Sequence, residues 1–378
     1  MNEFKRYWIC AAIISSLCIL LIGYQWFQVH RVGKQNTVEI RDRHTLQRNL
    51  AARDTIEFKN GNTHWEIPTG FFIQSLAFVN SSDVNITGYL WQKYPEDFPS
   101  HIKKGIIFPE EVSSNGTTLR QATTLKGTQN GINYKMICWY FDVTVRQSFD
   151  YSKYPLDFLT VWLRLWPGDL RLDQQVVLIP DFDAYTDTAR DVFGVDADIV
   201  QGEWDITETF YSYTNIPYDT NFGFFTKVSD HTYKEFYINL VIRRNFMNAF
   251  VVNLVPLFVV ALLLYAQIMT VSGRKEQAER FGFNASGAIA TCSALFFIVL
   301  LAHIQIRQLF AGSGLVYIEY FYLVMYLAIL WTALNAYVFS LGRLRRFNLI
   351  HYRDNLIPKL AYWPVVLGLL ALITWIKL

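Results

Sequence analysis

Six aspartates between Asp181 and Asp198 form a cluster of possible metal ligands in this 378-residue sequence. They are Asp181, Asp183, Asp187, Asp191, Asp196 and Asp198. Carboxylate oxygens are the ligands that Ca²⁺ prefers, so Asp181, Asp183 and Asp187 are candidate calcium ligands. Their spacing does not match an EF-hand loop. A solvated acidic loop is the alternative interpretation, and protons are another stimulus to which such a cluster could respond.

Residue patterns typical of enzyme active sites are missing from the sequence. It has no Gly-x-x-x-x-Gly-Lys phosphate loop, no Gly-x-Ser-x-Gly nucleophile turn and no zinc-ligand spacing. Of the four cysteines, only Cys138 lies outside the apolar segments, so no disulfide is expected within the polar part. We therefore expect a protein that is not an enzyme and that needs no cofactor apart from the possible Ca²⁺.

The composition indicates a membrane protein. Hydrophobic residues make up 52% of the chain and charged residues 17%, which excludes a disordered protein. The formal net charge is only +2, so a nucleic-acid partner is not expected. The apolar residues are unevenly spread, because residues 246–378 hold only four acidic and ten basic side chains.

Five segments are apolar enough to cross a bilayer, which takes about 20 residues of helix. They are Trp8 to Phe27, 246–270, 281–306, 315–340 and 360–376. The first segment could be a cleaved signal peptide. No small-x-small cleavage site follows it, so we favour an uncleaved signal anchor over residues 1–32.

Basic residues beside these segments predict the topology. Lys5 and Arg6 place the N-terminus in the cytoplasm, and the basic connections 271–280 and 341–359 are then also cytoplasmic. The chain is expected to be a multi-pass protein of the cell membrane. Its region 28–245 would be extracytoplasmic, and periplasmic in a Gram-negative host.

The polar region is expected to be all-β after a linker or cap at 33–64. Short runs rich in Val, Ile, Tyr, Phe and Trp alternate with turn residues, which is typical of a β-sandwich. The runs are 65–79, 84–94, 132–149, 156–166, 174–180, 199–213 and 234–244. We expect an immunoglobulin-like sandwich over 65–245, followed by a four-helix membrane domain over 246–378.

Several motifs in this order resemble the pentameric ligand-gated ion channels, over about residues 65–378. The motifs are Gly88-Tyr89-Leu90-Trp91, the turn Phe149–Asp157 with its aromatic-Pro-x-Asp sequence, Gly202-Glu203-Trp204-Asp205-Ile206, Arg243-Arg244, and Pro256 inside the next helix. Gln147 and Val161 stand where animal members have a disulfide, so the resemblance is to the bacterial branch. The extra N-terminal span and the lack of a proline in 307–314 depart from the family pattern.

The resemblance implies a homopentamer in membrane lipid that conducts monovalent cations. One helical stripe would line the pore: Glu279, Gly282, Ser286, Ile289, Ser293, Phe296 and Leu300. A ring of Glu279 at the inner mouth would favour cations. The competing stripe Arg280, Asn284, Gly287 and Thr291 would favour anions, and small residues that only permit helix packing are a third interpretation. Arg307 and Glu319 are expected to be solvated near the outer surface.

The resemblance also implies ligand and coupling residues. An aromatic cage between neighbouring sandwiches would hold an amine through cation–π attraction, although any of its members could belong to the core instead. The candidates are Trp91, Trp166, Tyr211, Tyr213, Tyr218 and Phe222. Coupling to the pore is expected from Pro155, Asp157, Arg244 and Pro256, with Asp157 lying beside Arg244.

The expected function is therefore a ligand-gated channel opened by a small ligand, protons or calcium acting on the outer domain. A non-conducting membrane receptor or adaptor with the same fold is the alternative. A membrane-anchored enzyme is a third hypothesis, for which the sequence offers no catalytic residues.

Overall fold

The computed structural model describes residues 2–31, 38–49, 65–112, 117–169, 176–200, 202–220, 222–223, 232–274, 276, 284–341 and 348–378. The chain divides into two compact units. A helical unit contains Met1–Lys34, Asp150–Asp157 and Asn245–Leu378, and a sheet unit contains Gln35–Phe149 and Phe158–Arg244. The chain therefore passes between the units at four places.

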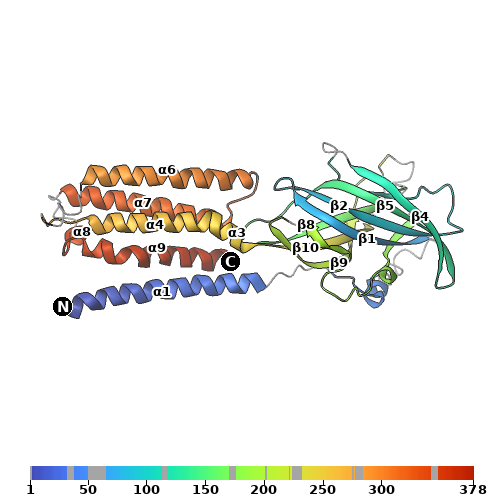
Figure 1. Ribbon diagram of the computed structural model, residues 1–378, viewed down its shortest axis with the longest axis horizontal. Coiled ribbons are helices and arrows are strands. Elements are labelled where there is room, and N and C mark those ends of the chain that lie inside the picture. The colour runs from blue at the N-terminus through green and yellow to red at the C-terminus, as the bar shows by residue number, and fades with distance from the viewer. Residues whose placement is uncertain are drawn as a thin grey trace. The chain divides into compact units, whose positions relative to one another are not determined.

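The sheet unit is β-sandwich-like (Figure 1). Its strands are β1 (Trp65–Phe78), β2 (Asp83–Pro95), β3 (Ile106–Ile107), β4 (Thr118–Gln129), β5 (Ile132–Arg146), β6 (Phe158–Pro167), β7 (Val176–Pro180), β8 (Val195–Val200), β9 (Trp204–Pro217) and β10 (Thr232–Arg244). One sheet has the order β4-β5-β2-β1-β7, with β8 also on β1, and the other has the order β3-β6-β10-β9.

Alternating side chains build the core of this unit. Ile86 and Leu90 on β2 are fully buried, as are Val161 and Leu163 on β6. Such a period of two places every second residue on the inner face of its sheet. The predicted strands are confirmed in their approximate positions, and β4 was missed because its side chains are almost all exposed.

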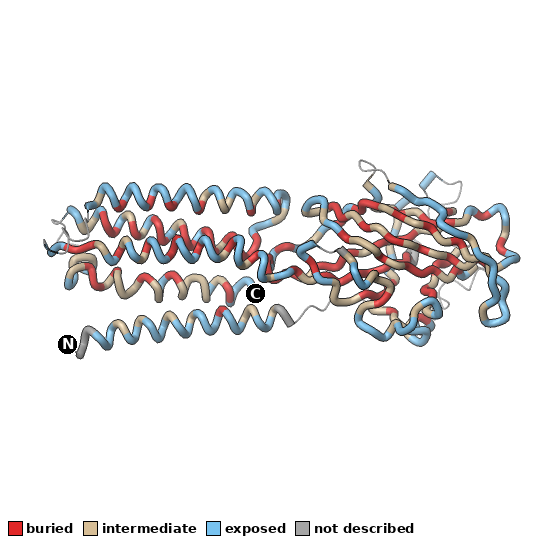
Figure 2. The backbone as a smooth tube through the Cα atoms, viewed as in Figure 1, coloured by how far each residue is buried: buried red, intermediate tan, exposed pale blue. Residues whose placement is uncertain are grey.

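The helical unit begins with α1 (Asn2–Arg31) and continues after the sheet unit. Its later elements are α3 (Phe246–Ala249), the π-helical turn η4 (Phe250–Leu254), α4 (Val255–Thr270), α6 (Ala285–Leu309), α7 (Tyr317–Leu341), α8 (Asn348–His351) and α9 (Leu356–Lys377). In the described part of the chain, five helical segments are long and apolar enough to cross a membrane, which confirms the five predicted spans. Exposed apolar side chains cover most of α1 and α6, as expected of a membrane-associated protein (Figure 2).

Pro256 explains the irregular start of α4. Proline lacks the N–H that an α-helix needs, and it lies here in the first turn of α4, directly after η4. The side chain of Asn253 donates to the carbonyl of Ala249 inside this wider turn (3.1 Å). Asn253 and Pro256 thus favour a π-helical turn, η4, between α3 and α4.

Asp83 at the start of β2 supports a pH-dependent contribution to stability. It accepts two hydrogen bonds from Arg146 across the ladder (2.7 and 2.9 Å), and these bonds lower its pKa below the ordinary 3.8. A carboxylate whose pKa is lowered by folding stabilises the fold at pH values above its ordinary pKa of 3.8. This contribution is lost as the pH falls from there through the lowered pKa of the folded state. Thermal unfolding between pH 6 and pH 3 should fall less steeply for Asp83→Asn than for the wild type. Parallel curves would contradict this assignment.

Candidate functional site

A loop between β5 and β6 lies among the helices rather than with the sheets. Residues Asp150–Asp157, the docking loop, belong to the helical unit although both flanking strands belong to the sheet unit. The backbone N–H of Tyr317 donates to the carbonyl of Ser152 (2.9 Å), and that of Ile318 donates to the carbonyl of Tyr154 (3.3 Å). The first turn of α7 therefore holds the docking loop by its backbone.

Aromatic side chains of the docking loop pack on the end of α6. The rings of Tyr151 and Tyr154 lie 4.9 and 4.6 Å from the ring of Phe310, the residue at which α6 ends. The hydroxyl of Tyr154 also accepts a hydrogen bond from Asn253 in η4 (3.2 Å). Tyr154 is buried, so a displacement of this loop must move α6, α7 or η4 with it.

The predicted coupling residues fall in both units. Pro155 follows a cis peptide bond in the docking loop, and Asp157 is buried at its end. Arg244 ends β10 in the sheet unit, where it pairs with Glu203 (3.1 Å) and lies 4.0 Å above the ring of Trp204. The pairing of Asp157 with Arg244 would join the two units and stays a prediction.

One face of α6 packs inside the helical unit and the opposite face is exposed. The packed residues are Ala288, Cys292, Leu295, Val299 and Ile306. Phe297, Ile298 and Leu301 on other sides of the helix are 61%, 54% and 62% exposed. The side chain of Asn284 caps the helix by accepting from the N–H of Gly287.

The predicted pore stripe lies at the border of the exposed face. Ser286 and Ser293 are exposed, Ile289 and Phe296 are 39% and 38% exposed, and Leu300 is half-buried. At about 100° per residue, the centre of the exposed face is rotated by about 70° from this stripe, toward Phe297 and Leu301. Of the competing stripe, Asn284, Gly287 and Thr291 are exposed. The predicted residues Glu279, Arg280 and Gly282 lie outside the described residues.

Three of the predicted ligand residues come together in the sheet unit. The rings of Trp166, Tyr218 and Phe222 contact one another edge to face, with centroids 5.2 to 6.3 Å apart, and we call them the aromatic cage. Trp166 lies at the end of β6, whereas Tyr218 and Phe222 follow β9. Phe222 is 44% exposed, so the cage opens to the surface.

A charged group that sequence analysis missed lies against the cage. Arg164 on β6 pairs with Glu110 and with Glu235 of β10 (2.9 Å to Glu235), and we call these three residues the charge triad. Glu235 also accepts hydrogen bonds from the indole of Trp166 (2.9 Å) and from the hydroxyl of Tyr218.

Burial affects the protonation of the charge triad. It raises the pKa of Glu110, although the charge of Arg164 acts in the opposite direction. The pKa of Tyr237 beside the triad rises to about 12, again mainly through burial. The aromatic cage is thus joined to the charge triad through Glu235, which accepts from Trp166 and Tyr218.

The remaining aromatic candidates lie elsewhere in the sheet unit. Tyr211 is fully buried, and its hydroxyl bonds that of Tyr185 (2.9 Å), so it belongs to the core. Tyr213 donates to the carbonyl of Leu178 (2.8 Å). Trp91 donates to Asp181 (2.9 Å), and its ring packs 5.8 Å from that of Tyr185.

The three candidate calcium ligands each contact a different base. Asp181 pairs with Lys93 (2.6 Å), Asp183 with Arg43 (2.5 Å) and Asp187 with Arg190 (3.6 Å). Within the ranges that the structure describes, no three His, Cys, Asp or Glu side chains are grouped as a metal site. Calcium binding therefore gains no support from the geometry.

Glu319 near the start of α7 is fully buried, so the expectation that it is solvated is wrong. Its carboxylate accepts from the N–H of Val316 (2.8 Å) and lies 3.3 Å from Arg307 and 3.4 Å from His303. Arg307 also donates to the carbonyl of Ser313 (2.7 Å). These contacts fix the turn between α6 and α7 on which the docking loop packs.

No family model matches the chain, and no curated protein matches it. The proposed function therefore rests on the geometry of the docking loop, the exposed face of α6 and the aromatic cage.

Proposed function

We propose that the protein is a pentameric ion channel of the cell membrane, opened by a small cationic ligand that binds the outer domain. The observation that carries this proposal is the docking loop. It connects two strands of the sheet unit, yet its side chains pack on the ends of α6 and η4. A change in the strands thus reaches a membrane-spanning helix through a single short loop.

The other parts of the site support the same proposal. The exposed face of α6 would line a pore shared by five copies, as the resemblance to pentameric ligand-gated channels implies. Arg164 already lies over the ring of Trp166 (5.5 Å), so an amine would bind at the exposed ring of Phe222, close to the residues that contact Glu235. The N-terminus would be cytoplasmic and the sandwich extracytoplasmic, and protons or calcium are alternative stimuli.

Native mass spectrometry of the full-length protein in mild detergent tests the assembly. A dominant species of five subunits is the expected result. Monomers or dimers in the presence of added lipid would leave no ring of helices to conduct ions, and the receptor or adaptor hypothesis would then replace the channel.

Current recordings in planar bilayers test selectivity, with tetramethylammonium, propylamine, protons and Ca²⁺ as trial stimuli. In a salt gradient, Glu279→Gln should move the reversal potential toward zero, because a ring of carboxylates at the pore mouth attracts cations. Glu276→Gln is the matched control and should leave the reversal potential as in the wild type. Equal effects of both variants would remove Glu279 from the pore.

A further inference from the structure

Residues 38–49 form a strap on one edge of the sheet unit. Strand β9 is the last strand of its sheet, and the strap supplies a backbone partner at that edge. The N–H of Ile40 donates to the carbonyl of Tyr211 (2.8 Å), and the N–H of Tyr211 donates back to the carbonyl of Ile40 (3.3 Å). Pairing with the edge strand of a sheet is one of the modes by which domains bind extended peptides.

Two apolar side chains anchor the strap on the sheet unit. The side chain of Ile40 is fully buried, and Leu46 is buried as well. Leu46 lies in the helical stretch 43–49, which the carboxylate of Asp42 caps by accepting from the N–H of Thr45 (2.7 Å). The strap thus has an extended part and a short helical part, and each part buries one apolar residue.

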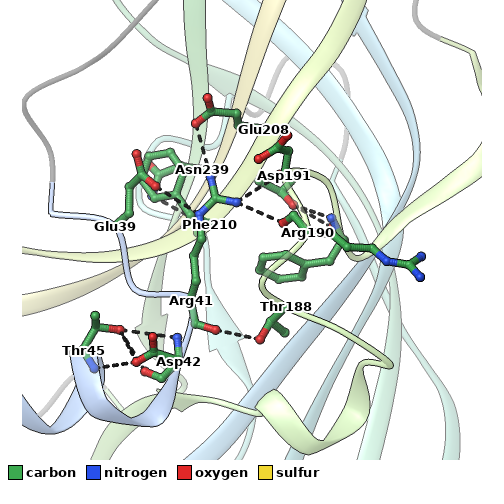
Figure 3. Close-up of polar contacts among 12 residues, drawn as sticks. Glu39, Arg41, Asp42, Thr45, Thr188, Arg190, Asp191, Glu208, Phe210 and Asn239 are labelled. Atoms are coloured by element: carbon green, nitrogen blue, oxygen red, sulfur yellow. Dashed lines mark hydrogen bonds and ion pairs between the residues drawn. The ribbon is translucent and has the colours of Figure 1, made fainter.

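Arg41 gives the strap a charged anchor (Figure 3). Its guanidinium pairs with Glu208 of β9 (3.2 Å) and donates to the carbonyls of Arg190 (3.0 Å) and Asp191 (3.4 Å). It also lies 5.9 Å from the ring of Phe210, and only 17% of the side chain is exposed. Hydrogen bonds from a charged donor are about twice as strong as neutral ones, so these partners favour an arginine at this position.

The elements that hold the strap are paired with one another without it. Strand β9 pairs with β10 along its whole length, and β10 pairs in turn with β6. The loop 188–191 is fastened to β9 by its own bond, from the N–H of Thr209 to the carbonyl of Asp191 (2.7 Å). In the same loop, the hydroxyl of Thr188 donates to the carbonyl of Arg41 (2.6 Å). The strap therefore lies on a surface that the rest of the sheet unit already forms.

We propose that the edge of β9 and the loop 188–191 form a peptide-binding site, which the strap occupies as a tethered ligand. The ligand class is an extended peptide in which an apolar residue is directly followed by arginine, as in Ile40-Arg41. Backbone pairing with Tyr211 supplies affinity, and Glu208 with the neighbouring carbonyls supplies specificity for arginine. Peptide binding at this site requires no ion conduction, so it does not rest on the proposed channel function.

Hydrogen exchange on the full-length protein in detergent tests whether the strap opens separately from the sandwich. The amide of Ile40 should exchange at least about tenfold faster than that of Ile238 in the middle of β10, because the strap can leave while the strands stay paired. Glu208→Gln should speed exchange at Ile40 by about a further fivefold. Asp205→Asn, at a carboxylate of the same strand that is 57% exposed, is the matched control and should leave it unchanged. Equal rates at Ile40 and Ile238 would make the strap an integral part of the fold and overturn the proposal.

Fluorescence anisotropy of a labelled peptide with the sequence of residues 38–49 tests the site with a separate ligand. Ile40→Asp together with Arg41→Gln empties the site in the full-length chain. This variant should bind the peptide at least about tenfold more tightly than the wild type, whose own strap competes at the high local concentration of a tethered segment. Failure of the emptied variant to bind the peptide would overturn the proposal, and if that variant does not fold, exchange in the unmodified chain decides the question.

Two altered peptides test the specificity for arginine. A peptide that carries Arg41→Gln should bind the emptied variant at least about tenfold more weakly than the unchanged peptide, because it loses the charge-assisted bonds. A peptide that carries Arg43→Gln is the matched control and should bind like the unchanged peptide, since Arg43 is 62% exposed. Equal binding of all three peptides would refute an arginine-specific site.

Discussion

Arg164→Met is expected to destabilise the full-length protein by about 3–5 kcal/mol, the cost of removing one partner from a buried ion pair. Glu110 and Glu235 would then lie close together without a cation, and their side chains are only 14% and 6% exposed. Thermal unfolding in detergent, followed by intrinsic fluorescence, measures the loss. Trp166 lies against the triad and reports on the same region.

Two further variants separate the charge effect from a general loss of packing. Adding Glu110→Gln and Glu235→Gln to Arg164→Met should recover most of the lost stability, because no unpaired carboxylate then remains. Arg190→Met is the matched control. Arg190 is 71% exposed and its partner Asp187 is 45% exposed, so its loss should cost less than about 1 kcal/mol. A similar cost for both arginines would show that the triad is not a buried charge group.

For the proposed channel, Tyr154→Ala is expected to abolish the response to the stimulus while binding of the stimulus at the sheet unit persists. The substitution removes the ring that packs on Phe310 and the hydroxyl that accepts from Asn253. Loss of such a buried aromatic ring costs about 3–5 kcal/mol, which exceeds most allosteric coupling energies. Current recordings with the stimulus found for the wild type measure the effect.

Tyr154→Phe is the matched variant. It retains the ring contact with Phe310 and loses the hydrogen bond from Asn253, so about a fifth of the wild-type response should remain, in line with about 1 kcal/mol for one hydrogen bond. Equal losses in both variants would assign the coupling to the hydroxyl. A normal response in Tyr154→Ala would exclude the docking loop from the gating path.

The order of the chain's elements could be predicted because each had a strong local pattern. A span needs about 20 apolar residues in a row, and five such runs stand out in the sequence. Strand β6 was predicted from the alternation around Val161 and Leu163. The sequence of β4 lacks this pattern because both of its faces are exposed, and its place depends on pairing with β5.

The residues of the candidate site were harder to predict. The site depends on the direction of each side chain and on contacts between residues that are far apart in the sequence. Trp166, Tyr218 and Phe222 contact one another, whereas Tyr211 faces the core at the middle of β9. The charge triad joins Arg164 to residues 54 and 71 positions away, which no local pattern reveals; the charged residue inside the apolar run of β6 was the available signal. The choice of which face of α6 is buried likewise depends on the neighbouring helices, which the sequence of α6 alone does not reveal.

The docking loop also has a consequence for biosynthesis. Its partner Asn253 is 99 positions after Tyr154, and Phe310 and Tyr317 follow later still. During synthesis from the N-terminus, the strands on either side of the loop are complete long before these helices exist. Tyr151, Tyr154 and Leu156, all buried in the finished protein, are therefore left without their packing partners until the last third of the chain has been synthesised. The nascent sheet unit carries an exposed apolar loop through this interval, and that loop is a natural target for chaperones.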